Sequence, residues 1–203
     1  MSGKPRSSLI AQTGIHGGAN HALTLEFIQN ALQNAQKGEW LILQNEVNLV
    51  PEIAHFAREK GMKICYSAAP FIESDALNMI DKIDLLAVNE GEASALSHAI
   101  GKDIHALSLP MLLITKGKAG AILHLAEEDN SITQNAFEVE AVDSTGAGDV
   151  FLGAFMAHFT KTADAQSSLK WATAASAIQV TRAGAANAIP SQAEIAYFLR
   201  DKI

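Results

Sequence analysis

The chain has 203 residues, 48% hydrophobic and 18% charged. This is the composition of one folded globular domain spanning residues 1–203, and it excludes a disordered or low-complexity chain. Its formal net charge is −7, from 15 Lys and Arg against 22 Asp and Glu. With no basic run, nucleic-acid binding is not expected. No stretch approaches the length of a membrane span and no signal-peptide apolar region is found, which predicts a cytoplasmic protein without membrane contact. The single cysteine, Cys65, lies in an apolar run and is expected to be a buried, inert thiol.

Short apolar runs alternate with longer helical patterns in the first half of the chain, an order typical of βαβ units. The expected strands are residues 9–13, 40–43, 62–66 and 85–88. The expected helices are residues 25–35, 51–60, 75–80 and 90–99. Four such units in series predict an α/β fold, a doubly wound and mostly parallel sheet with helices on both faces.

The pattern changes at residue 111. Two strands, 111–115 and 121–125, are joined by a short glycine-containing segment, and a polar turn follows at 127–130. This spacing predicts antiparallel strands that close one side of the sheet. The last third is helical, with helices expected at 150–159, 169–181 and 192–202.

The most informative segment is Asp143-Ser144-Thr145-Gly146-Ala147-Gly148-Asp149, which directly precedes an apolar helix. Two glycines allow a tight turn in which successive N–H groups face one concavity at a helix N-terminus, and such a concavity binds negative charge. A carboxylate at its edge could take a proton from an attacking hydroxyl. The alternative is a plain connection with Asp149 as a helix cap. The spacing matches neither a dinucleotide-binding motif nor a P-loop.

This segment resembles the signature of the ribokinase-like carbohydrate kinases, also called the phosphofructokinase-B type. The resemblance implies a ribokinase-like fold, ATP as a cofactor and transfer of its γ-phosphoryl group to a hydroxyl of a sugar or related alcohol. It implies that Asp149 is the catalytic base and that the amides of Gly146, Ala147 and Gly148 form the anion hole.

The same resemblance implies ion and substrate contacts within and before the segment. Asp143 and the backbone of Thr145 become candidates for holding a monovalent cation such as K⁺, and Asp143 also becomes a candidate substrate contact. Glu46 lies in a segment similar to the strand end where the family places a sugar-contacting Glu. Residues 67–70 depart from the Asn-x-x-Pro that the family carries after the following strand.

Asn89 and Glu92 resemble the family's Asn-x-x-Glu, which acts through Mg²⁺ and its waters on the nucleotide phosphates. Mg²⁺ prefers oxygen ligands and keeps several waters, so the chemistry is suitable. The alternative is a helix N-cap with its capping partner three residues on.

Two later segments also resemble the family. Thr115, Gly117 and Gly120 are similar to its Thr-x-Gly-x-x-Gly, whose turn lies against ATP, although alone they indicate only a hairpin. Residues 171–188 resemble the helix and loop that line its adenine pocket.

The resemblance implies a sugar kinase whose N-terminal lid and part of the sugar site are absent from this sequence. The alternative is a non-catalytic nucleotide-binding or interaction module. An uncovered sheet edge would favour a homo-oligomer such as a homodimer. The seven histidines show no zinc-type spacing, so they are expected to have packing or surface roles.

Overall fold

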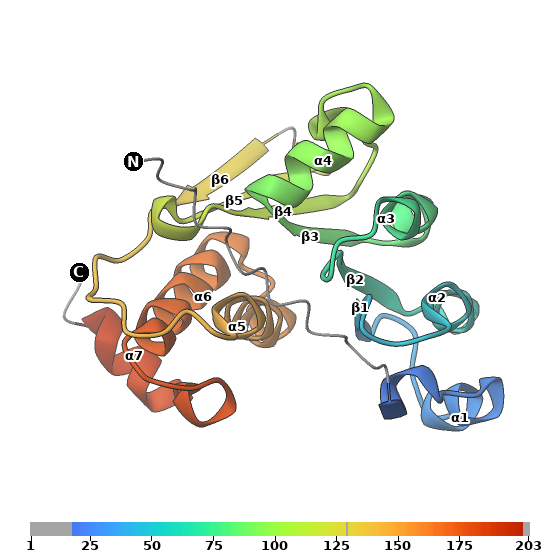
Figure 1. Cartoon of the computed structure of the whole chain (residues 1–203), viewed down its shortest axis with the longest axis horizontal. Helices are drawn as coiled ribbons and strands as arrows, with labels where there is room; N and C mark the ends of the chain where they lie inside the picture. Colours follow the sequence, from blue (N-terminus) through green and yellow to red (C-terminus); the bar gives the residue numbers. More distant parts are fainter. Residues whose placement is uncertain (1–17, 129, 201–203) are drawn as a thin grey trace, which may run out of the picture.

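The computed structural model describes residues 18–128 and 130–200. Their core is one six-stranded sheet in the order β1-β2-β3-β4-β5-β6 (Figure 1). The strands are β1 (Trp40–Gln44), β2 (Lys63–Ser67), β3 (Leu85–Asn89), β4 (Met111–Thr115), β5 (Ala121–Leu125) and β6 (Asn130–Gln134). The first four run parallel, and β5 and β6 are antiparallel to their neighbours. The predicted change from parallel to antiparallel pairing is therefore confirmed.

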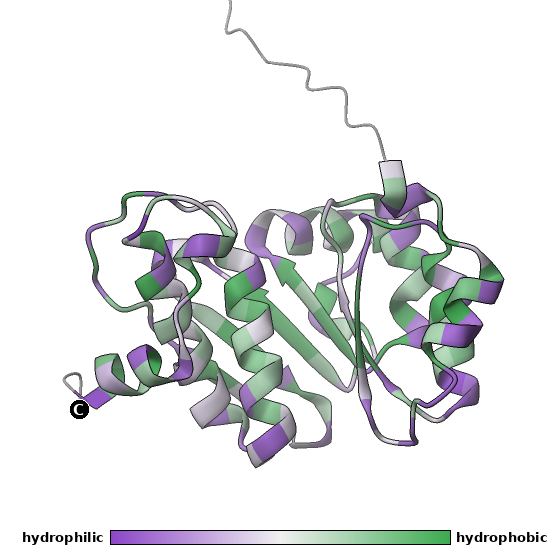
Figure 2. Cartoon of the chain, turned by 90° about the horizontal axis from the view of Figure 1, so that it is seen from below, coloured by the Kyte–Doolittle hydropathy of each residue, from purple (hydrophilic) through white to green (hydrophobic). Residues whose placement is uncertain are grey.

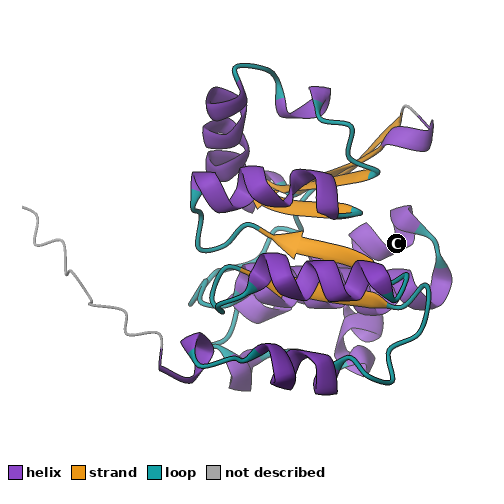
Figure 3. Ribbon diagram, turned by 90° about the vertical axis from the view of Figure 1, so that its right-hand side faces the viewer, coloured by secondary structure: helices purple, strands orange, loops and turns teal. Residues whose placement is uncertain are grey.

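Helices cover both faces of this sheet, as Figures 1 and 3 show. They are α1 (Leu25–Ala31), α2 (Val50–Glu59), α3 (Glu73–Met79), α4 (Glu90–Ile100), α5 (Ala147–Thr162), α6 (Ala165–Val180) and α7 (Gln192–Arg200). The crossovers through α2, α3 and α4 all step in the same direction, and crossovers of one hand then place their helices on one face. The expected α/β class with two helical layers is confirmed. The second layer is supplied by α5 and α6, which follow the last strand.

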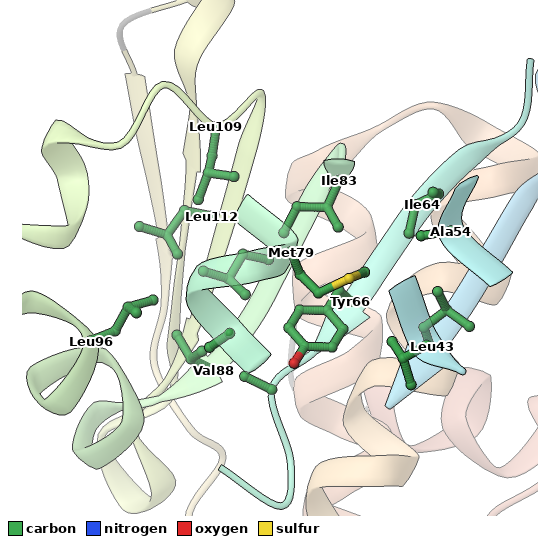
Figure 4. Packing of buried hydrophobic residues seen from close by; sticks show 14 of the residues in the cluster. Leu43, Ala54, Ile64, Tyr66, Met79, Ile83, Val88, Leu96, Leu109 and Leu112 are labelled. Carbon is green, nitrogen blue, oxygen red and sulfur yellow. The ribbon is translucent and has the colours of Figure 1, made fainter. Parts of the chain in front are cut away.

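The first core lies between the sheet and α2, α3 and α4. Side chains alternate along each strand, so every second residue faces this layer. Figure 4 shows ten labelled members of this core: Leu43, Ala54, Ile64, Tyr66, Met79, Ile83, Val88, Leu96, Leu109 and Leu112. The inner strands β2, β3 and β4 are buried on both faces, which explains why they read as nearly continuous apolar runs.

The second core lies between the opposite face of the sheet and α5 and α6. Cys65, Leu85 and Leu113 face this layer, and they pack with Phe151 and Phe155 of α5. Figure 2 shows the hydrophobic strands enclosed between the helical layers. Cys65 is fully buried, as predicted, and burial raises the pKa of its thiol to about 12.

Several predicted boundaries differ from the structure. The expected strand 9–13 lies outside the described residues. Helix α1 ends at Ala31 rather than residue 35, and α5 begins at Ala147 rather than residue 150. Strand β6 (Asn130–Gln134) was not predicted: the predicted turn covers residues 127–130, and the sequence assigns no element to the residues that follow it. Within residues 18–128 and 130–200, no helix combines the length and apolarity needed to span a bilayer.

Candidate active site at the carboxyl ends of the strands

The first turn of α5 presents unpaired amides to the surface. Gly146 is its N-cap and has φ 72° and ψ 5°, a left-handed conformation that suits glycine. The amide of Ala147 donates to the Ser144 carbonyl at 3.2 Å. Among the described residues, the amides of Gly148 and Asp149 have no acceptor. Free N–H groups and the positive end of a 16-residue helix together form an anion-binding position.

Gly148, in this turn, is exposed. A Cβ built on Gly148 would meet no atom within 4 Å. Asp149 is exposed, and its carboxylate lies at the rim of a cleft between α5, α6, α7 and the 185–190 loop. A carboxylate in this position can receive a proton from a bound molecule. The interpretation of Asp149 as a capping residue does not explain its side chain, since Asp149 is the third residue of the helix rather than its N-cap.

Strand β1 supplies a side-chain contact to Asp149. Gln44, the last residue of β1, donates from Nε2 to Oδ1 of Asp149 at 3.1 Å. The segment after Gln44 is fixed by Tyr66, whose hydroxyl donates to Asn45 Oδ1 at 2.6 Å, and burial raises the pKa of Tyr66 to about 12. Glu46 is exposed two residues beyond Gln44. The predicted substrate-contacting segment thus lies beside the α5 N-terminus.

A second cleft, here called the β4–α6 cleft, lies on the other side of the same turn and has a volume of about 550 Å³. Four groups of residues line it. They are Thr115, Gly117, Lys118 and Gly120 of the turn after β4; 136–139 and Ala141; Ser144, Ala147, Gly148 and Phe151; and Thr173, Ser176, Ala177 and Val180 of α6. The volume is in the range of small-molecule sites. The structure therefore brings the predicted residues Thr115, Gly117 and Gly120 together with Ala147 and Gly148.

Gly120 permits this cleft because its backbone contacts the segment after β6. Its φ is 98°, and a Cβ there would lie 2.0 Å from the Gln134 carbonyl oxygen. Any side chain would push the segment away. The glycine is thus required by close backbone approach, and the segment from Ala136 onward becomes one wall of the cleft.

Asn89 and Glu92 form a reciprocal capping box at the start of α4. Asn89 Oδ1 accepts from the Glu92 amide at 2.9 Å, and Glu92 Oε2 accepts from the Asn89 amide at 2.8 Å. Asn89 pairs in register with Thr115, so both lie at the carboxyl edge of the sheet. The capping interpretation is confirmed, and it leaves Oε1 of Glu92 without a hydrogen-bond partner among the described residues.

These oxygens could hold a hydrated divalent cation rather than a dehydrated one. No group of three or more His, Cys, Asp or Glu side chains within the described ranges could hold a metal ion. Mg²⁺ commonly binds through one or two protein oxygens, waters and substrate phosphates. The oxygen atoms of Asn89 and Glu92 fit that mode, and Asn89 pairs with Thr115, which lines the β4–α6 cleft.

Asp143 ties the turn before α5 to the loop after α6. Its Oδ1 accepts from the amide and the hydroxyl of Thr145 at 2.9 and 2.7 Å, and its Oδ2 accepts from the Gly184 amide at 2.9 Å. These hydrogen bonds lower the pKa of Asp143 to about 2. Both oxygens of the predicted substrate and cation contact are therefore already engaged within the chain.

Two site residues were missed by the sequence interpretation. Gln44 contacts Asp149 across 105 residues of sequence, a pairing that only the fold creates. Gln179 is fully buried near the α5 N-terminus. A glutamine inside the apolar run of α6 was the available signal, because a buried amide needs partners.

Comparison with known proteins agrees with this arrangement. Residues 12–192 match the model of the pfkB family carbohydrate kinases. The chain belongs to this family. It is 31% identical over 189 residues to the ribokinase of Lactococcus lactis, covering 91% of this chain and 61% of that protein. It is 28% identical over 186 residues to the deoxyribokinase of Salmonella typhi, covering 86% of this chain and 60% of that protein.

Solved structures give the same result. The ribokinase of Thermotoga maritima superposes with a TM-score of 0.78 at 30% identity, covering 91% of this chain and 64% of that one. The Arabidopsis thaliana ribokinase, complexed with ribose and ATP, gives 0.76 at 25% identity with the same coverage. The chain therefore spans less than two thirds of the length of these relatives.

Proposed function

We propose that the chain is an ATP-dependent phosphotransferase that acts on a hydroxyl of a sugar or related alcohol. The observation that carries this proposal is the first turn of α5, where unpaired amides and the exposed Asp149 carboxylate lie side by side between two clefts. Relatives named ribokinase and deoxyribokinase, and a related structure complexed with ribose and ATP, support it. As an enzyme that uses ATP, it is proposed to act in the cytoplasm.

The nucleotide is proposed to occupy the β4–α6 cleft. Its apolar wall of Phe137, Phe151 and Ala177 suits a flat ring, and Thr115 and Gly117 line the side nearest the sheet. This pose directs the triphosphate towards the N-terminus of α5, where the amides of the first turn can donate to the γ-phosphate oxygens.

Asp149 is proposed to act as the general base. The acceptor hydroxyl transfers its proton to the carboxylate while its oxygen forms a bond to the γ-phosphorus. The bond from that phosphorus to the bridging oxygen breaks, and ADP leaves with the electron pair. Gln44 holds Oδ1 and leaves Oδ2 for the hydroxyl. Glu46 and Asp143 are the further acceptor-side contacts that the family resemblance proposes.

Asn89 and Glu92 are proposed to position hydrated Mg²⁺. When bound, this ion would neutralise phosphate charge. The chain contributes Oε1 of Glu92, which has no hydrogen-bond partner among the described residues, and the capping box that orients it. Replacing Glu92 would therefore weaken both the N-terminal cap of α4 and the binding of the ion.

The test is transfer from ATP to a panel of pentoses, hexoses and nucleosides by the purified chain, compared with Asp149→Ala. A positioned base contributes about 10²–10⁴ in rate, so turnover should fall by about that factor while ATP affinity is kept. Asp164→Ala is the matched control, since Asp164 is an exposed carboxylate that caps α6. An unchanged rate of transfer in Asp149→Ala would show that Asp149 is not the general base.

A non-catalytic nucleotide-binding module is the second outcome of the same experiment. Relatives named as kinases give that alternative no support. ATP binding without transfer to any acceptor would nevertheless favour it.

We also propose that β1 pairs with β1 of a second copy. β1 is an end strand of the sheet, carries no charged residue from Trp40 to Gln44, and exposes 45% of Ile42. Uncharged edge strands favour pairing between chains. Sedimentation should detect a dimer that Ile42→Lys weakens. A strictly monomeric wild type at micromolar concentrations would contradict this.

A further inference from the structure

Three backbone carbonyl groups converge on one side chain behind the α5 N-terminus. Nε2 of Gln179 lies 3.2 Å from the Thr145 carbonyl oxygen, 3.3 Å from that of Gly184 and 3.0 Å from that of Ala185. Gln179 is in the last turn of α6 and is fully buried. The three oxygens come from the turn before α5 and from the loop after α6.

The orientation of this amide follows from its neighbours. A carboxamide has two N–H donors on nitrogen and only acceptor capacity on oxygen. Reversing the group would bring Oε1 against three carbonyl oxygens, so the nitrogen must face them. Oε1 is left buried without a partner. Leaving a buried acceptor unsatisfied lowers the stability of the folded chain. In this orientation the loss is accompanied by the contacts of the Nε2 donor with the three carbonyl oxygens.

A small cluster of inward-facing carbonyl oxygens is the usual environment of a monovalent cation. The family resemblance implies such a cation at the Thr145 backbone and Asp143. In this chain, the Thr145 carbonyl already accepts from Gln179, and both oxygens of Asp143 accept from Thr145 and Gly184. An amide nitrogen 3.0–3.3 Å from the three carbonyls fills the position where an ion would have to lie. The residues present therefore do not fit K⁺.

We infer that the Gln179 carboxamide replaces a monovalent cation in this protein, so that its phosphate-binding turn is held together without K⁺. The partial positive charge of its N–H groups stabilises the converging carbonyl oxygens in place of an ion. Gln179 is a positioning residue: Nε2 would lie 3.8 Å from a Cβ on Gly146, the N-cap that sets the direction of the α5 amides. Its effect on activity rests on the proposed kinase function, whereas its effect on cation binding does not.

The first experiment measures the thermal melting of the wild-type chain in KCl, NaCl and choline chloride at equal ionic strength. The melting temperature should be the same in all three salts, because no site is left for K⁺. A ²⁰⁵Tl⁺ NMR titration should likewise detect no bound ion. A K⁺-specific rise in melting temperature, or a saturable Tl⁺ signal, would overturn the inference.

The second experiment removes the donor. Gln179→Ala and Gln179→Ser should melt below the wild type in choline chloride and should recover with K⁺, by about 5 °C or more once K⁺ exceeds its dissociation constant a hundredfold. Gln166→Ala is the matched control, because Gln166 is an exposed glutamine of the same helix. It should melt like the wild type in every salt.

Failure of both Gln179 variants to respond to K⁺, or to fold with or without it, would also overturn the inference, because the carbonyls would then be unable to hold an ion. A kinase assay in the same salts separates the two proposals. Transfer by the wild type should not depend on K⁺. An inactive wild type with cation-responsive Gln179 variants would refute the proposed function and leave the role of Gln179 intact.

Discussion

The substitution Gly148→Ala separates the stability of the proposed phosphate site from its function. Gly148 is the second residue of α5, and a Cβ there would meet no atom within 4 Å. Alanine in a helix is more favourable than glycine by roughly 0.5–1 kcal/mol. We therefore expect the variant to be as stable as the wild type or slightly more stable in urea unfolding.

The same methyl group should impair ligand binding. Gly148 lines the β4–α6 cleft, and its free amide is one of two that can donate to a phosphate. A methyl group beside the amide keeps the phosphate from hydrogen-bond distance. A hydrogen bond to a charged group contributes about 1.5–3 kcal/mol, so ATP affinity should fall by about 10- to 100-fold.

Gly153→Ala is the matched control for this experiment. Gly153 lies five residues further along α5, also with open space around its Cβ position, and it does not line the β4–α6 cleft. It should gain similar stability and keep wild-type ATP affinity in calorimetry. Wild-type ATP affinity in Gly148→Ala would refute the assignment of this turn as the phosphate site.

Two further predictions concern titrating groups. The pKa of Asp143 is lowered from 3.8 to about 2 by hydrogen bonds from Thr145 and Gly184, so its contribution to stability is present above pH 3.8 and is lost as the pH falls towards 2. The free energies of urea unfolding of the wild type and Asp143→Asn should therefore become equal over that pH range. A difference in unfolding free energy that does not change with pH would contradict this. Because burial raises the pKa of Cys65 to about 12, its thiol should not react with Ellman's reagent at pH 8 in the native chain and should react after denaturation. A rapid reaction of the native chain would show that the core around Cys65 opens to solvent.

The regular elements were predictable where a single physical signal dominated. The strands 111–115 and 121–125 were predicted at their observed bounds, because apolar runs ended by a glycine turn have few alternatives. Helix α5 was predicted to begin three residues late, since Gly148 and Asp149 have low helix propensity. At the first turn, propensity is overridden by the N-cap geometry of Gly146. Strand β6 was missed because its stability comes from pairing with β5 rather than from its own composition.

The site was predictable in its local parts and not in its long-range ones. The motif containing Asp149 could be found from residue types alone, and the structure places its amides and carboxylate at the surface. Gln44 could not be found this way, because its contact depends on where β1 ends relative to α5. Gln179 required knowing which loop carbonyls meet at its amide.

The topology explains why residues so far apart in sequence share one edge of the sheet. The four parallel strands place Gln44, Ser67, Asn89 and Thr115 at the same carboxyl edge. The chain then runs away from this edge in β5 and back to it in β6, because each of these strands is antiparallel to the one before it. Gln134 therefore lies opposite Ala121 at the same edge. An even number of antiparallel strands is required for this return. With one such strand, the segment from Ala136 and the turn before α5 would start at the opposite edge, and neither wall of the β4–α6 cleft could form.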